Sequence, residues 1–322
     1  MRFLYQTPWS TTALASMGIP GMALSENTRG AILMAASMAG FTINDALTKS
    51  VTDELTVAQI MFIRGAMTTI LVYAVARRLG ALDHIRNIRQ PLILCRIAFE
   101  TIAAIAFLSA LGQVPLANTS AILQSLPLAV TLGAALVYRE PVGWRRWTAI
   151  GLGFIGVMVI IKPGPEGFTL ASLYVVLSVI TAAGRDLVTR KIDPNVSSLT
   201  VTLFTASSIS LAGLLLVPAF GGWQSVSLNT FATVALASAF LFVGYQAIIM
   251  AMRIGEISFI APFRYTSLLW AVALGMLFFG ETPDLSMGIG AAIVIGSGLY
   301  TFYREKQRKA GLAATSEAGS PG

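Results

Sequence analysis

Two long stretches without a charged residue limit the folds that this chain can adopt. No Asp, Glu, Lys or Arg occurs from Thr101 to Tyr138 or from Pro194 to Met252. A helix needs only about 20 apolar residues, at about 1.5 Å each, to cross the hydrocarbon core of a bilayer. Each stretch therefore predicts two spans joined by a turn, and segments rich in chain-breaking residues at 112–120 and 221–229 supply the turns.

The composition is that of an integral membrane protein. Hydrophobic residues make up 55% of the 322 residues and charged residues 11%, against roughly 25% charged in soluble domains. The net charge of +7 does not predict a nucleic-acid partner, because the basic residues lie between apolar spans and not on one solvated face. A single cysteine, Cys95, and a single histidine, His84, argue against a disulfide framework, a zinc site and a histidine-based triad. We expect no cofactor, no metal site and no enzymatic activity.

We predict an all-α integral membrane protein with ten transmembrane helices. Apolar runs between charged or turn-rich segments place the spans near residues 30–50, 57–77, 92–111, 118–137, 144–161, 168–188, 197–218, 230–252, 257–279 and 285–303. The lipid bilayer is thus the first expected partner.

The basic residues orient these spans. Lys and Arg favour cytoplasmic loops. With the N-terminus inside, sixteen of them fall on the inner side, and only Lys49 and Lys162 fall on the outer side. We therefore expect both termini to be cytoplasmic, as tails at residues 1–29 and 304–322.

Two short motifs recur at one distance along the chain. The segment NDALTK at 44–49 returns as RDLVTR at 185–190, which lies 141 positions later. The segment ALVYRE at 135–140 returns as MLFFGE at 276–281, again 141 positions later. Two matches at one offset predict an internal repeat.

The repeat divides the ten spans into two five-helix halves, residues 30–165 and 166–303. Because five is odd, the two halves must cross the membrane in opposite orientations. The loop after Glu140 carries Arg145 and Arg146, whereas the loop after Glu281 carries no Lys or Arg before the next span. Inverted repeats are typical of secondary transporters, whose substrate site lies near the midplane between the halves.

With this layout, the chain resembles a known family. The segments YREPVGWRRW at 138–147, GFIGV at 153–157 and FFGET at 278–282 are similar to the EamA group of the drug/metabolite transporter (DMT) superfamily. The resemblance covers roughly residues 30–303 and implies a small-molecule transporter of the bacterial inner membrane. Where the family pattern has Gly-Glu, the first half has Arg139 before its glutamate, which puts the turn at this position in question.

Two further segments narrow the resemblance. QSLPLAVT at 124–131, together with PFRYTS at 262–267, is similar to a proteobacterial branch that is associated with riboflavin uptake. The resemblance thus implies uptake of riboflavin or a similar heterocyclic nutrient. Import or export of amino acids, S-adenosylmethionine-like metabolites or drugs is the alternative, because other members of the superfamily move such solutes. We also consider a homodimer.

Arg264 is the only charged residue between Ile257 and Gly280. A charge near the centre of a span costs about 2.5–3.5 kcal/mol on insertion scales, so it should face protein or a water-filled cavity. Its helical neighbours Ala261, Ser267 and Ala271 are small enough for close packing or for a cavity wall. Arg264 therefore either contacts substrate or forms a buried ion pair.

Polar residues in other spans extend this candidate site. Positions 141 residues before Tyr265 and Thr266 are Gln124 and Ser125, and a proline lies close to each cluster. Arg64 finds no acid within its own span, and Tyr245 and Gln246 could offer aromatic stacking and amide hydrogen bonds to a planar solute. The candidate substrate-binding residues are Arg264, Tyr265, Thr266, Gln124, Ser125, Tyr245, Gln246 and Arg64.

Three intramembrane acids are candidates for ion pairing or for coupling to an ion. Each has a basic residue four positions away, on the same helix face. We expect each acid to pair within its own helix, as Asp45 with Lys49, Glu100 with Arg96, and Asp186 with Arg190.

Overall fold

The computed structural model describes residues 25–78, 90–140, 142–162, 169–192, 196 and 198–318. Within these ranges the chain forms helices and turns, and ten helices are long and apolar enough to cross a membrane. The predicted all-α fold of ten spans is therefore confirmed. His84 and three of the sixteen basic residues expected on the inner side, Arg2, Arg86 and Arg89, lie outside the described residues.

The first half contains the helices α2 (Glu26–Lys49), α3 (Val57–Arg78), α4 (Pro91–Leu111), α5 (Leu116–Leu123), α6 (Leu126–Val137) and α7 (Trp144–Ile161). The second half contains α8 (Leu170–Thr189), α9 (Ser198–Leu216), η2 (Val217–Phe220), α10 (Leu228–Ile254), α11 (Ile257–Ile260), η3 (Ala261–Tyr265), α12 (Thr266–Phe279) and α13 (Leu285–Ala318). The last helix thus continues beyond residue 303, where the sequence predicted a tail.

The fourth span of each half is broken at a repeat-equivalent place. In the first half, α5 ends at Leu123 and α6 begins at Leu126; in the second half, η3 ends at Tyr265 and α12 begins at Thr266. Pro127 and Pro262 stand near the two breaks, where proline removes a backbone donor. The breaks lie 141 positions apart, so the repeat is one of structure as well as of sequence.

The turn that ends each broken span is also repeated. Arg139 and Gly280 both adopt positive φ, at 53° and 63°. The following glutamate N–H groups donate to Ala134 O at 3.3 Å and to Gly275 O at 3.0 Å. The Arg-Glu sequence thus keeps the turn, although the left-handed region disfavours a residue with a side chain.

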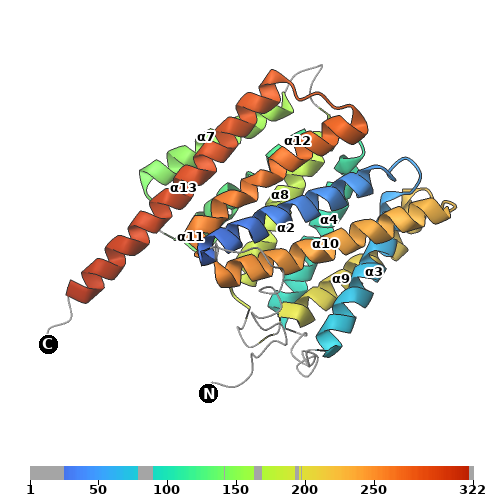
Figure 1. The fold of residues 1–322 in the computed structure, drawn as a ribbon, viewed down its shortest axis with the longest axis horizontal. Helices are drawn as coiled ribbons and strands as arrows, with labels where there is room; N and C mark the ends of the chain where they lie inside the picture. The colour runs from blue at the N-terminus through green and yellow to red at the C-terminus, as the bar shows by residue number, and fades with distance from the viewer. Residues whose placement is uncertain are drawn as a thin grey trace, which may run out of the picture.

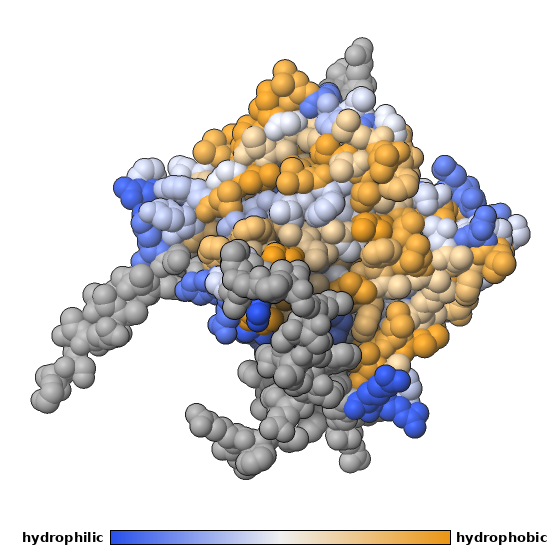
Figure 2. All heavy atoms as spheres, in the orientation of Figure 1, coloured by the Kyte–Doolittle hydropathy of each residue, from blue (hydrophilic) through white to orange (hydrophobic). Residues whose placement is uncertain are grey.

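Each main helix packing joins one half to the other. Helix α2 packs on α10 and α12, α3 on α9, α4 on α8, and α7 on α13 (Figure 1). Under the repeat, the α2–α10 contact corresponds to the α8–α4 contact, which gives the bundle a pseudo-twofold arrangement. Hydrophobic side chains cover much of the face in Figure 2, as lipid contact requires. The interior therefore lies between the halves, where both can contribute to a site.

The two ends of the bundle are named here after two glutamates. The Glu140 end carries the start of α2, the end of α8, the start of α7 and the continuation of α13. The Glu281 end carries Lys49 and the α12–α13 loop. Most basic residues of the described chain lie at the Glu140 end.

The α7–α13 contact depends on small residues. A Cβ atom added to Gly156 would lie 2.8 Å from Gly290 O, a backbone atom that cannot move aside, whereas one added to Gly151 meets nothing within 4 Å. Gly156→Val is expected to destabilise the protein by about 1–3 kcal/mol through overpacking. The measurement is the thermal unfolding midpoint of the purified protein. Gly151→Val, in the same helix, is the control, and equal midpoints for the two variants would contradict the argument.

Candidate substrate site

A cluster of charged side chains lies inside the bundle, between α4 and α8. Arg185 pairs with Glu100 at 2.7 Å and with Asp186 at 2.8 Å, and the Arg185 and Glu100 side chains are largely buried. Arg96 donates to the hydroxyl groups of Thr189 at 3.0 Å and Thr205 at 2.7 Å. The predicted Arg96–Glu100 pair is therefore wrong. The two helices pack closely, so the guanidinium of Arg185 reaches Glu100 across the contact.

A second group of polar residues adjoins this cluster. Asp45 on α2 accepts a hydrogen bond from Asn44 at 2.9 Å and interacts electrostatically with Arg64 on α3. Arg64 also interacts with Tyr245 and Glu100, which links the two groups. Among the described residues, no acid lies within the 4.0 Å ion-pair distance of Arg64. Its positive charge is therefore balanced only at longer range.

Tyr245 on α10 supplies an aromatic face to this region. Its ring meets Phe41 edge to face, with centroids 5.1 Å apart. Charges of Glu100, Arg185 and Arg64 act on its hydroxyl, yet 40% of its surface is accessible. Its side chain thus lies near charged groups from three helices and keeps an accessible ring. Gln246 beside it is half-buried and makes no hydrogen bond to the described residues.

Arg264 reaches a cavity of about 570 Å³ from the broken ninth span. Asp186 lines the same cavity and its charge acts on Arg264, but its carboxylate is already paired with Arg185. No acid of the described chain lies within ion-pair distance of the Arg264 guanidinium. The full set of lining residues is Leu126, Pro127, Val130, Thr131, Ala134, Glu140, Arg146, Asp186, Arg190, Arg264, Gly298, Thr301 and Phe302.

The remaining candidates hold the helix breaks together. Gln124 donates to Ser267 Oγ at 2.5 Å and to Arg264 O at 3.4 Å, and so ties the two breaks to each other. Ser125 donates to Ile122 O and Thr266 to Phe263 O, each within its own turn. The contacts of Gln124 position Arg264 at the cavity. The contacts of Ser125 and Thr266 stabilise the turns at the two breaks.

Tyr265 has a different environment. Its hydroxyl is buried and has no hydrogen-bond partner among the described residues. Gly298 of α13 makes room for this hydroxyl, since an added Cβ atom there would collide with it. Helix α13 packs against α7 and also forms part of the cavity wall.

An ion pair between the halves lies at the Glu281 end. Lys49 at the end of α2 meets Glu281 at 2.8 Å, and their side chains are only 11% and 16% exposed. The other Glu281 oxygen accepts the Leu116 N–H at 2.7 Å, and Lys49 donates to Val114 O at 2.6 Å. The predicted Asp45–Lys49 pair is therefore wrong. This buried pair closes the Glu281 end.

The repeat-equivalent ion pair lies at the Glu140 end. Arg190 meets Glu140 at 3.0 Å, with side chains 51% and 43% exposed, so the predicted Asp186–Arg190 pair is also wrong. Both residues line the cavity that contains Arg264. Of these two repeat-equivalent pairs, the one at the Glu140 end is thus half-exposed at the rim of a cavity, whereas the one at the Glu281 end is nearly buried. The bundle is open at the Glu140 end and closed at the Glu281 end.

A second ion pair reinforces the closed end. Lys162, after α7, hydrogen-bonds Asp284, before α13, and this bond lowers the pKa of the Asp284 carboxyl group. The pair is half-exposed, so its contribution to stability is small. The charged form of Asp284 is favoured in the folded protein, and the contribution is lost as the pH falls through the lowered pKa.

The pairing of Lys49 with Glu281 and that of Arg190 with Glu140 were not predicted from the sequence. The signal was present, because each of the two repeat motifs contributes one charged residue at each end of the bundle. Instead, each acid was predicted to pair with the base four positions away on its own helix. In an inverted repeat, the base of one half meets the acid of the other.

Comparisons with known proteins agree with the ten-helix fold and its two halves. The model of the EamA-like transporter family matches residues 28–162 and 169–303. A riboflavin transporter of Vibrio cholerae is 29% identical, over 83% of this chain and 90% of its own. An S-adenosylmethionine uptake transporter of Rickettsia prowazekii is 24% identical, over 88% of this chain and 96% of its own. A crystal structure superposes with a TM-score of 0.59 at 16% identity, covering 84% of this chain and 96% of the other.

Proposed function

Since this chain belongs to the EamA-like transporter family, we propose that it takes up riboflavin or a similar heterocyclic nutrient across the bacterial inner membrane. Both termini then lie in the cytoplasm, as the distribution of basic residues suggests. The cavity at the Glu140 end faces the cytoplasm in this arrangement. Transport proceeds by alternating access between the two inverted halves.

The observation that carries the substrate proposal is the unmatched guanidinium of Arg264 in the cavity. The central region holds four arginines against three acids, the former being Arg64, Arg96, Arg185 and Arg264 and the latter Asp45, Glu100 and Asp186. A net positive site favours a neutral or electron-rich solute over a cation. The carbonyl oxygens of an isoalloxazine ring accept hydrogen bonds from guanidinium groups.

Tyr245 supports the same class of solute. Its accessible ring can stack on a planar heterocycle, and aromatic contacts of this kind contribute about 0.5–1.5 kcal/mol beyond the area that they bury. The sulfonium group of S-adenosylmethionine carries a positive charge and would meet repulsion from the arginines. Riboflavin is therefore the first substrate to test.

The test is uptake by a riboflavin-requiring bacterial host that lacks its own importer. Cells with this protein are expected to grow at low riboflavin and to accumulate labelled riboflavin saturably, whereas vector controls do neither. Excess unlabelled riboflavin should abolish accumulation, and excess S-adenosylmethionine should leave it unchanged. If cells with the protein in their membrane show no uptake above the vector, the riboflavin proposal is wrong. Strong inhibition by S-adenosylmethionine would instead favour the alternative substrate class.

A further inference from the structure

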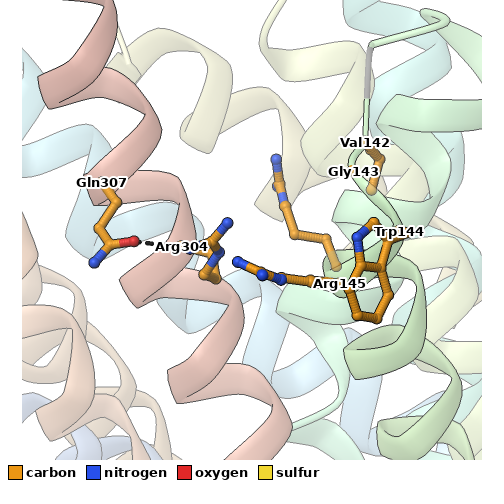
Figure 3. A pocket seen from close by; sticks show the side chains of 7 residues that line it. Val142, Gly143, Trp144, Arg145, Arg304 and Gln307 are labelled. Carbon is orange, nitrogen blue, oxygen red and sulfur yellow. Dashed lines mark hydrogen bonds between the residues drawn. The ribbon is translucent and has the colours of Figure 1, made fainter.

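A second pocket, of about 700 Å³, lies at the Glu140 end, between the start of α7 and α13 (Figure 3). It is lined by Val142, Gly143, Trp144, Arg145, Arg146, Arg304 and Gln307. Only Arg146 also lines the cavity that contains Arg264. The pocket is therefore a separate feature from the candidate substrate site.

The charge of this pocket favours an anion. Its lining includes three arginines and, among the described residues, no acid. The side chains of Arg145 and Arg304 extend toward each other across the space in Figure 3. Arg304 donates to the Gln307 side chain at 2.8 Å, and Arg145 lies over the Trp144 ring at 5.4 Å. Like charges that face each other repel, and a negative group between them relieves that repulsion.

The depth of the pocket indicates where the anion comes from. The membrane-spanning part of α7 begins at Trp144, and that of α13 ends at Arg304. The pocket therefore lies at the level of the lipid headgroups. Trp144 is 71% exposed, and Tyr303, whose hydroxyl accepts a hydrogen bond from Gln307, is 58% exposed, as is typical of side chains at the membrane interface.

An apolar surface continues from the pocket into the membrane. On α7, Leu152 and Ile155 are each more than half exposed, and Gly151 between the pocket and these residues leaves open space. A small soluble anion makes no apolar contact with such a surface, whereas an acyl chain can lie along it. The pocket and the surface together match a phosphate group that carries fatty-acid chains.

We infer that this pocket binds the headgroup of an anionic phospholipid from the surrounding bilayer. Arg145 and Arg304 contact the phosphate from two sides, and Trp144 packs beside the glycerol region. Basic pockets between membrane helices are suited to such headgroups. Since Arg146 lines both spaces, the bound lipid lies next to the mouth of the transport cavity.

The test measures lipid binding by native mass spectrometry of the purified full-length protein. Phosphatidylglycerol and phosphatidylcholine are added at equal concentration, and phosphatidylglycerol adducts are expected to be retained preferentially and to decline with added salt. Each basic residue near the membrane surface contributes about a fivefold change in affinity for anionic lipid. Arg145→Gln or Arg304→Gln should thus weaken phosphatidylglycerol binding about fivefold, and the double variant about twenty-five-fold.

The matched control is Arg253→Gln, which removes an exposed arginine at the same end, on α10 and outside the pocket. This variant should bind phosphatidylglycerol like the wild type. Equal retention of the two lipids by the wild-type protein would overturn the inference without any variant. So would equal losses in Arg253→Gln and Arg145→Gln. Displacement of the lipid by millimolar glycerol phosphate would show that the pocket takes a soluble anion instead.

Discussion

Replacing Arg264 with alanine is expected to lower riboflavin uptake by about tenfold to about a hundredfold. The guanidinium lines the cavity, and the one acid that shares this cavity with it and acts on it, Asp186, is paired with Arg185 at 2.8 Å. A hydrogen bond from a charged donor contributes about 1.5–3 kcal/mol, which corresponds to this range in affinity. The measurement is the initial uptake rate, normalised to the amount of protein in the membrane.

A second variant separates substrate binding from simple charge balance. If Arg264 served only to neutralise Asp186, the double variant Arg264→Ala with Asp186→Asn would recover uptake. If Arg264 binds the solute, the double variant stays as inactive as Arg264→Ala. Arg253→Ala, at an exposed position outside the cavity, should transport normally. Normal uptake by Arg264→Ala would remove the binding role altogether.

Much of the fold could be predicted because the membrane imposes simple rules. Uncharged runs set the number of spans, and the prolines noted beside the two polar clusters lie close to the places where the fourth and ninth spans break. The end of α13 was missed for a physical reason. Residues after Tyr303 are charged and end the membrane span, but many are good helix formers, so the helix continues through them to Ala318.

The ion pairs could not be predicted from spacing along one helix. Residues four apart share a helix face, but a long basic side chain in a packed bundle also reaches acids on neighbouring helices. Arg185 reaches Glu100 on α4, and Lys49 reaches Glu281 beyond α12. Which acid a basic side chain pairs with depends on how the helices pack, and spacing along one helix does not determine that packing. The repeat restricted the choice, since a contact between the halves at one end of the bundle implies its equivalent at the other end.

Glu281→Gln is expected to shift the protein toward a conformation that is open at the Glu281 end. The variant leaves Lys49 without its acid in a nearly buried position, and it weakens the bond that the Leu116 N–H donates. Loss of a charged hydrogen-bonded partner costs about 1.5–3 kcal/mol, enough to move a two-state population at least about tenfold. Uptake should fall as well, because the cycle then lacks a stable closed state at this end.

Cysteine labelling can measure each end separately. After replacement of Cys95 by serine, a cysteine is introduced in place of Thr131, which lines the cavity, or of its repeat mate Val272. The Thr131 position should label rapidly with a soluble thiol reagent in the otherwise native protein, and the Val272 position slowly. Glu281→Gln should accelerate labelling at Val272 and slow it at Thr131, and the ratio of the two rates should change by at least about tenfold.

Glu140→Gln is the matched control, because the inverted repeat makes it the same change at the opposite end. The Arg190–Glu140 pair is half-exposed here and contributes at most about 1 kcal/mol, so its loss has little effect on this conformation. Loss of the pair instead destabilises the opposite conformation, in which the Glu140 end closes and buries the pair. Glu140→Gln should therefore leave Thr131 accessible and Val272 protected. If both variants change the two labelling rates in the same direction, the ion pairs stabilise the fold as a whole and do not control access from each end.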